Sequence, residues 1–217
     1  MTFPVRPLIL LLLSASWASA ELTFAQFEVN AAIPDNDAAG LLNTQTVTSD
    51  ITSIESITVT LNITGGWNGD LYAYVAHESG LAVLLNRVGK TSGNEFGSAS
   101  SGFTVTFSDT ALNGDIHTGS FASGTPITGI WAPDARTASP TSVTDASSRT
   151  AFLSTFQGLP ASGTWELFVA DVSGGDTSYL ESWSMEISGS TGEVIPEPSA
   201  MLPLAALFAT ALWRRRR

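Results

Sequence analysis

Four aspartates carry the most visible candidate chemistry in this sequence. Asp35 and Asp37 lie close together near the N-terminus, and Asp171 and Asp176 lie on either side of a glycine-rich turn. Calcium takes about six to eight oxygen ligands from carboxylates, amides and carbonyls, usually in loops. Aspartate is also common in turns because its side chain accepts hydrogen bonds from the nearby backbone. Two interpretations therefore stay open: a calcium site at these four aspartates, or ordinary turn formation.

Hydrolytic chemistry would need a nucleophile, a base and an orienting acid, and the candidates are few. The chain has two histidines, His77 and His117, and no cysteine. No serine lies in a Gly-x-Ser-x-Gly motif. The pair His77-Glu78 is not followed by a second histidine at the spacing of a zinc protease motif. We predict that the chain has no catalytic residues and is not an enzyme.

Charge restricts the class of partner. Residues 21–213 hold four Lys and Arg against twenty Asp and Glu, a net charge of −16. A surface this acidic repels nucleic acid and anionic lipid, and it attracts divalent cations and basic partners. The absence of cysteine also excludes a disulfide framework and a thiolate metal site. About 175 residues remain between the two ends of the chain, which is enough for one domain with a sizeable core.

Alternating apolar residues predict the elements that must position these side chains. Ile57, Val59, Leu61 and Ile63 alternate with polar residues over one segment, and this period of two is typical of a strand with one buried face. Four more segments repeat the pattern: 71–75, 103–107, 165–169 and 183–187. Residues 81–85 are almost continuously apolar, which predicts a central strand. The fold class is therefore all-β, an antiparallel β-sandwich.

Two segments depart from the strand pattern. Residues 147–156 place Ala151, Phe152 and Phe156 at helical spacing before Gly158 and Pro160, so we predict one short helix or helical turn there. Residues 109–148 are rich in Gly, Thr, Pro and Asp, which predicts a long loop region. A loop of that length in a compact domain is often functional.

Aromatic residues divide into a core set and a candidate binding set. Trp165 and Trp183 lie in step with the aliphatic residues of their strands, which predicts burial. A sugar-binding surface would need exposed rings, and the candidates are Tyr72, Tyr74 and Trp131.

The N-terminus has the three-part pattern of a secretory signal peptide. Arg6 supplies a positive start, residues 8–13 are an unbroken apolar run, and Ala18-Ser19-Ala20 places small residues before a cleavage point. We predict that residues 1–20 are a signal peptide, and that the chain is handled by export machinery.

The C-terminus is patterned as a spacer and an anchor. Residues 191–199 hold Gly192 and a proline pair that excludes a helix or central strand. An uncharged apolar stretch, residues 200–213, then precedes four arginines. Its length alone favours a short core helix, but an arginine cluster beside an apolar segment favours membrane insertion with the cluster in the cytoplasm. We predict a separate short apolar helix and a transmembrane sorting tail over residues 200–217.

This tail resembles a known sorting signal. Pro196, Glu197 and Pro198, an apolar helix, and the cluster Arg214, Arg215, Arg216 and Arg217 are similar to the PEP-CTERM signal. The resemblance implies an exosortase-like processing enzyme in a Gram-negative bacterium that makes extracellular polysaccharide. It also implies cleavage near Pro196, so that membrane anchoring is transient.

The domain itself, residues 21–190, resembles the P domain (P/Homo B) of proprotein convertases. The resemblance is carried by three blocks: Ala32-Ile33-Pro34-Asp35-Asn36, then Gly69-Asp70-Leu71, then Gly163-Thr164-Trp165-Glu166-Leu167 followed by Asp171 and Trp183. It implies a jelly-roll sandwich, often with bound calcium. In the family this domain follows a subtilisin-like catalytic domain, for which this chain has no room.

These observations lead to one expected function and two rivals. The first is a non-catalytic, exported binding or scaffolding protein of the cell surface or extracellular matrix, with a polysaccharide or protein partner. The second is an accessory P domain linked to the activity of a separate subtilisin-like serine endopeptidase. The third is a carbohydrate-binding module. Fold alone does not choose among them.

Overall fold

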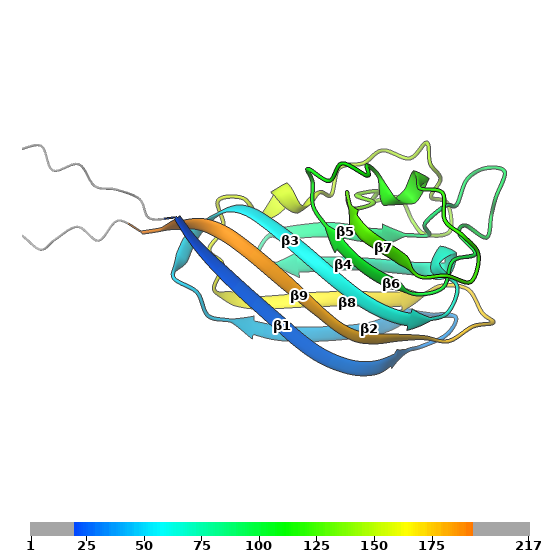
Figure 1. Cartoon of the computed structure of the whole chain (residues 1–217), viewed down its shortest axis with the longest axis horizontal. Helices are drawn as coiled ribbons and strands as arrows, with labels where there is room; N and C mark the ends of the chain where they lie inside the picture. The colour runs from blue at the N-terminus through cyan, green and yellow to red at the C-terminus, as the bar shows by residue number, and fades with distance from the viewer. Residues whose placement is uncertain (1–19, 193–217) are drawn as a thin grey trace, which may run out of the picture. The chain divides into compact units, whose positions relative to one another are not determined.

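The chain passes repeatedly between two β-sheets from its first described strand to its last (Figure 1). The structure is a computed structural model that describes residues 20–192. The predicted signal peptide except Ala20, the sorting motif, the apolar C-terminal helix and the arginine cluster lie outside these residues. Residues 20–191 form one compact unit. Within the described residues, no helix has the length and apolar character that a membrane crossing requires.

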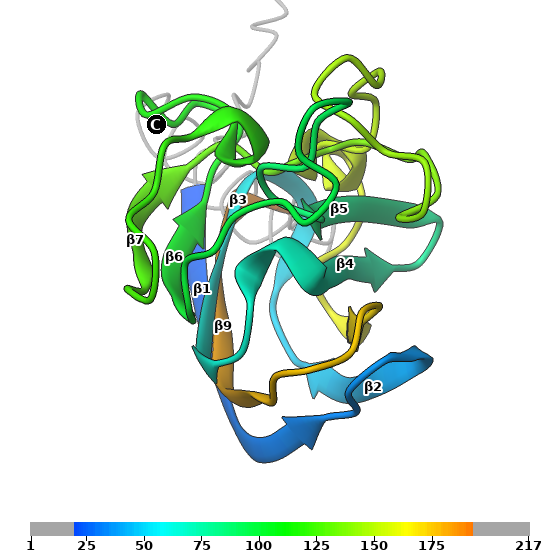
Figure 2. The same cartoon turned by 90° about the vertical axis from the view of Figure 1, so that its right-hand side faces the viewer.

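The two sheets pack face to face as the predicted sandwich (Figure 2). One sheet has five strands, in the order β1 (Ala20–Ile33), β9 (Ser178–Thr191), β3 (Ile51–Gly65), β6 (Phe103–Phe107) and β7 (Ile127–Trp131). The other has four, in the order β2 (Asp37–Val47), β8 (Gly163–Asp171), β4 (Leu71–His77) and β5 (Gly80–Asn86). The first and last described strands lie side by side, with Ala20 opposite Ser190. The all-β sandwich is therefore confirmed.

The core follows the predicted alternation. The apolar residues of β3 from Ile57 to Ile63 are buried, and the polar residues between them are half-buried on the outer face. Trp165 and Trp183 are fully buried, as predicted. Trp183 donates its indole N–H to Oδ1 of Asn43 at 2.8 Å, and Trp165 donates to the carbonyl of Ala161 at 3.0 Å. Each buried indole thus has the partner that its polar edge requires.

The prediction of a central strand at residues 81–85 is wrong. β5 is an edge strand of the four-stranded sheet. All of its residues except Leu81 are buried, because the loop after β7 covers that edge. The N–H groups of Asp134 and Ala135 donate to the carbonyls of Leu84 and Val83, at 3.1 and 2.9 Å. A covered edge strand has the same continuous apolar composition as a central strand, so composition could not distinguish them.

The long loop region contains more order than its composition predicted. It includes a short 3₁₀ turn, η2 (Ile116–Thr118), and the strand β7. β7 pairs with β6 in parallel, so the antiparallel sandwich has one parallel pair at an edge. The two strands can run parallel because residues 108–126 return the chain to the other end of the sheet before β7 begins.

The helix predicted over residues 147–156 is a single 3₁₀ turn, η3 (Leu153–Phe156). Arg149 forms an isolated bridge with Arg136, which holds the chain extended before the turn. Leu153 and Phe156 are buried against the core. The remaining 3₁₀ turn of the described residues is η1 (Asn68–Asp70), which leads into β4.

Candidate functional site

Three of the four predicted calcium-binding aspartates meet at one end of the sandwich. Asp171 is the last residue of β8 and is 1% exposed, and its Oδ1 accepts a hydrogen bond from the N–H of Ser173 at 3.2 Å. Asp35, in the turn between β1 and β2, accepts from the N–H of Gly175 at 3.3 Å. Asp176 belongs to the same β8–β9 loop. This group, with Asp70, is called the acidic end below. Asp37 is exposed and accepts from the N–H of Ala39.

Asp70 joins this group, and sequence reasoning did not assign it a role there. It ends η1 and forms an ion pair with Arg87, with Nη2 of Arg87 and Oδ1 of Asp70 3.3 Å apart. Gly69 allows this arrangement, because a Cβ at that position would overlap the carbonyl oxygen of Phe96. The Gly-Asp-Leu block thus packs a tight turn against a neighbouring loop and delivers one carboxylate to the acidic end.

The acidic end is short of positive charge. Burial raises the pKa of Asp171 to about 6, and the nearby carboxylates of Asp70 and Asp35 add to this effect. The N–H of Ser173 and the guanidinium of Arg87 act in the opposite direction. Burial also raises the pKa of Asp70, in spite of its ion pair with Arg87.

These carboxylates do not form a ready metal cage. In the part of the chain that the structure describes, no three His, Cys, Asp or Glu side chains are placed to hold a metal ion. Asp70 is paired with Arg87, and Asp171 and Asp35 each accept from a backbone N–H. The calcium prediction therefore depends on the family resemblance and on the local negative charge, and it stays a prediction.

Calcium binding has a direct test at this end. A cation that binds the folded domain and not the unfolded chain adds ~1.4 kcal/mol to the free energy of unfolding when its concentration is about tenfold above its Kd. Millimolar calcium should then raise the Tm more than sodium does at equal ionic strength, and Asp171→Ala should remove the difference. Asp145→Ala, an exposed change in the loop after β7, is the control. Equal effects of the two salts would assign these aspartates to turn formation, because screening alone does not distinguish them.

His77, at the end of β4, is committed to the fold. Its Nδ1 lies 2.8 Å from the carbonyl oxygen of Thr164, and its Nε2 lies 2.8 Å from that of Pro160. Its ring stacks on Trp165, with ring centroids 4.1 Å apart and an interplanar angle of 3°. Both ring nitrogens thus lie within hydrogen-bond distance of backbone carbonyl oxygens, and the side chain is buried. These contacts join the end of β4 to the start of β8 and to the loop before it.

His117 is committed in the same way, inside a buried charge network. Its Nδ1 lies 2.7 Å from Oδ2 of Asp134, and its Nε2 lies 2.8 Å from the carbonyl oxygen of Lys90. Burial lowers the pKa of His117, but the hydrogen bond and charge of Asp134 outweigh it, so the net pKa is raised. Asp134 also accepts from Nη1 of Arg136, and Nη2 of Arg136 donates to Asp115 at 2.8 Å. These four residues, His117, Asp134, Arg136 and Asp115, are called the buried network below.

The aromatic candidates do not form one exposed row. Tyr72 and Tyr74 lie on the outer face of β4, half-buried, and Tyr74 stacks against Phe168 with centroids 5.0 Å apart. Trp131 lies on β7, in the other sheet, and packs edge-on against Phe121. A sugar ring that stacks on protein needs a free aromatic face, and stacking against Phe168 covers a face of Tyr74.

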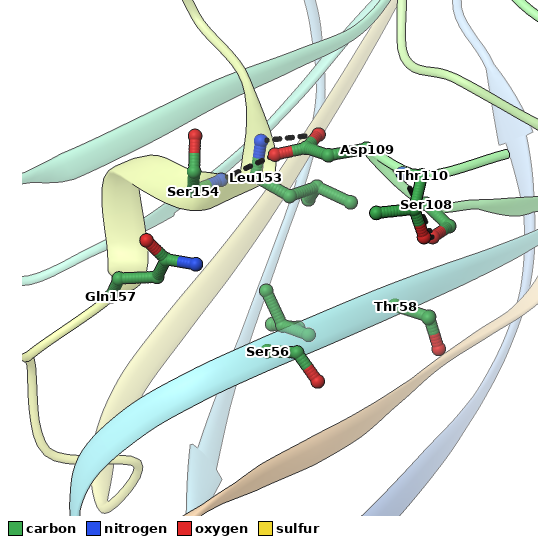
Figure 3. A pocket seen from close by; sticks show the side chains of 9 residues that line it. Ser56, Thr58, Ser108, Asp109, Thr110, Leu153, Ser154 and Gln157 are labelled. Carbon is green, nitrogen blue, oxygen red and sulfur yellow. Dashed lines mark hydrogen bonds between the residues drawn. The ribbon is translucent and has the colours of Figure 1, made fainter.

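A polar pocket of about 270 Å³ lies between β3 and η3 (Figure 3). Asp109 holds η3 in place there, because its two carboxylate oxygens accept from the N–H groups of Leu153 and Ser154 at 3.0 and 2.7 Å. Ile57 and Leu153 give the lining an apolar part, and six of the nine lining residues carry hydroxyl or amide groups: Ser56, Thr58, Ser108, Thr110, Ser154 and Gln157. Such groups can donate and accept hydrogen bonds to a neutral polar ligand.

Sequence reasoning missed Asp134, Arg136 and Asp70. A signal for them was available in the charge pattern. The domain has only four basic residues, Arg87, Lys90, Arg136 and Arg149, and all lie between residues 87 and 149. Buried charges need partners, so scarce cations gathered beside Asp115 and Asp134 could have indicated an internal network.

No protein-family model matches the chain, and no curated protein matches it. Among solved structures, the chain is similar to the serine protease of Aeromonas sobria, with 13% identity and a TM-score of 0.44, over 79% of this chain and 27% of that one. A chain in the complex of that protease with its chaperone (ORF2) gives 14% identity and a TM-score of 0.46, over 80% and 28%. The chain thus spans about a quarter of the length of the solved chains it matches.

Proposed function

We propose that this chain is a non-catalytic, exported domain that binds or scaffolds other molecules at the cell surface or in the extracellular matrix. One observation carries the proposal: both histidines use both ring nitrogens in hydrogen bonds that hold the fold. In the described residues, neither histidine is then available as the general base that a serine nucleophile requires. Export and transient anchoring are proposed on the two end segments alone.

The chemistry of the surface supports a neutral or basic partner. Arg87, Lys90 and Arg136 are buried, and Arg149 is half-buried and directed to Asp115 and the carbonyls of Pro133 and Asp134. The exposed charge of the described residues is therefore almost wholly acidic. A neutral polysaccharide would find matching groups in the polar pocket, and a basic protein segment would be attracted to the acidic end. A pull-down of the domain from its own extracellular matrix would distinguish these partners.

Inactivity is the direct test of the proposal. We expect the purified chain to hydrolyse no peptide or ester substrate above the rate in buffer, because both histidines use their ring nitrogens in hydrogen bonds within the described domain. The measurement is turnover of fluorogenic peptide and ester panels at several pH values. Replacing His77 and His117 by glutamine, one at a time, is the control for trace contamination. Turnover that co-purifies with the chain and disappears in one of these variants would contradict the proposal.

A second candidate is an accessory role beside a separate subtilisin-like serine protease. The observation that favours it is that the blocks of the P-domain resemblance meet in space: Leu71, after Gly-Asp, pairs in register with Asp171, and Trp165 and Trp183 fill the core. A gene for a protease that lacks its own P domain, beside the gene for this chain, would favour this candidate over the first.

A further inference from the structure

β1 is a long edge strand with one side unpaired in the described domain. It pairs there only with β9, through Ala20–Glu28 and Ala31–Ile33, and it ends the five-stranded sheet (Figure 1). Its fourteen residues make it one of the longest strands of the described domain. The outer row of backbone N–H and C=O groups on such a strand is a template for another strand.

The side chains of β1 do not discourage such pairing. Leu22 and Phe24 are 61% and 62% exposed on its outer face. The strand contains no lysine, arginine or proline, and its only charged residues are Glu21 and Glu28. Natural edge strands are usually kept apart by lysine, proline, short length or a covering loop. Over Ala20–Glu28 the pairing with β9 is also free of bulges, so this part of the edge is regular.

The inner face of β1 shows that the core is incompletely covered on this side. Ala25, Phe27 and Val29 point toward the core but are only partly buried. The core residues of the next strand, including Trp183 and Ile187 on β9, are fully buried. A further strand beside β1 would cover the inner residues and would also pack against Leu22 and Phe24 on the other face.

The other sheet ends contrast with this edge. β7, the opposite end of the same sheet, has only five residues. The edge of β5 is covered by the loop that contains Asp134 and Ala135. Among the sheet ends of the described residues, only β2 resembles β1 in length, and its outer face carries one large exposed apolar residue, Leu42.

We propose that β1 is an assembly surface, and that its partner is β1 of a second copy in antiparallel pairing. This goes beyond the proposed binding function, because it concerns how copies join. Two residues that lie opposite each other in an antiparallel pair have their side chains on the same face of the sheet. In a pair related by a two-fold axis perpendicular to the sheet, opposite residues are therefore both even-numbered or both odd-numbered, so their numbers have an even sum. Glu21 and Glu28 therefore cannot face each other across the pair.

The axis lies at Phe24. This register pairs Phe24 with its own copy, an aromatic cross-strand pair that stabilises a sheet. It also places Leu22 opposite Gln26, Glu21 opposite Phe27 and Glu28 opposite Ala20, so no carboxylate faces another. β1 is thus complementary to itself in apolar pattern and in charge. The two acidic domains still repel at long range, so salt should strengthen the pairing.

Disulfide trapping tests both the surface and the register, because the chain has no cysteine of its own. Full-length chains carrying Leu22→Cys and Gln26→Cys are mixed under mild oxidation. The mixture should give disulfide-linked dimers of one variant with the other. Each variant alone should give few, since its own two cysteines would lie ~13 Å apart along the strands. Ile130→Cys, on β7 and 54% exposed, is the matched control and should not cross-link.

Association in solution gives the second test. The purified chain, followed by analytical ultracentrifugation, should form dimers that strengthen between about 20 mM and 0.3 M NaCl. Phe24→Glu should weaken dimerisation at least tenfold and leave the Tm of the monomer unchanged, whereas Ile130→Glu should do neither. A monomer at all concentrations, dimers indifferent to Phe24→Glu, or cross-linking through Ile130→Cys alone would each overturn the proposal. Capture of a different protein by a monomeric chain through β1 would overturn it as well.

Discussion

Replacing Asp134 by alanine is expected to lower the free energy of unfolding by about 3–5 kcal/mol. Asp134 is fully buried. Its carboxylate accepts from His117, from the guanidinium of Arg136, and from the backbone N–H groups of Asn86 and Arg136. Alanine would leave protonated His117 without its counter-ion and Arg136 with Asp115 alone, and the cost of an unpaired buried charge exceeds the worth of most single contacts. For a domain of this size the Tm should fall by about 10 °C.

The pH dependence of this loss identifies its cause. The pKa of His117 is raised in the folded state above its unfolded value of 6.5. Its contribution to stability is therefore fully present below pH 6.5 and is lost as the pH rises through the folded pKa. The difference in stability between the native chain and Asp134→Ala should shrink over that range. Any stability difference that persists at high pH would come from the loss of the Asp134–Arg136 ion pair, because Arg136 keeps its charge.

Chemical denaturation at several pH values measures this effect. Asp145→Ala is the matched control, because Asp145 is exposed and its carbonyl, not its side chain, bonds to Arg136. It should change stability by less than about 0.5 kcal/mol. If Asp134→Ala and Asp145→Ala lowered the free energy of unfolding by similar amounts, the buried network would contribute no more to stability than an ordinary surface residue.

Much of the fold followed from strand periodicity. The alternation of Ile57 with its neighbours, and the positions of Trp165 and Trp183, predicted buried faces that the structure confirms. β1 and β2 were not predicted, although Leu22 to Phe27 shows some alternation. Each of these strands is a sheet edge and carries apolar residues on both of its faces. The alternation of one polar and one apolar face, which identifies a strand in a sequence, is therefore weak.

The site was harder to predict because it is assembled from distant segments. Asp35, Asp70 and Asp171 lie far apart in sequence and meet only when β1, η1 and β8 end at one place. Local motifs located Asp35, Asp171 and Asp176 but could not show that Asp37 stays exposed. The burial of Arg136 and His117 depends on a loop that covers the edge of β5, and no periodic pattern predicts such a cover.

Replacing Asp171 by asparagine is expected to stabilise the domain at pH 7.5 in the presence of a chelator. The folded pKa of Asp171 is about 6, above its ordinary 3.8. A raised carboxyl pKa contributes stability that is fully present below pH 3.8 and is lost as the pH rises through about 6. A pKa difference of about two units changes the free energy of unfolding by ~3 kcal/mol at most. We expect a gain of about 1–2 kcal/mol, or a Tm rise of about 3–6 °C.

The asparagine keeps an oxygen that can accept from the N–H of Ser173, so the change removes charge and little else. The variant should also lose most of the decline in Tm that the native chain shows between pH 4 and pH 6.5. Asp37→Asn, at the exposed position opposite Asp171 in the β2–β8 pairing, should alter neither the Tm nor its slope. These Tm values are measured by thermal unfolding at fixed ionic strength.

The same series with calcium in place of the chelator separates the two interpretations of the acidic end. If the carboxylates only form turns, Asp171→Asn stabilises the domain in both buffers, because no calcium ion then balances the buried charge of Asp171. If calcium binds there, the native chain gains stability from calcium and the variant does not, so the advantage of the variant shrinks, and it reverses once the gain from calcium exceeds it. A destabilised variant under the chelator would contradict a raised pKa at Asp171, because it would show that the ionised carboxylate is favoured in the fold.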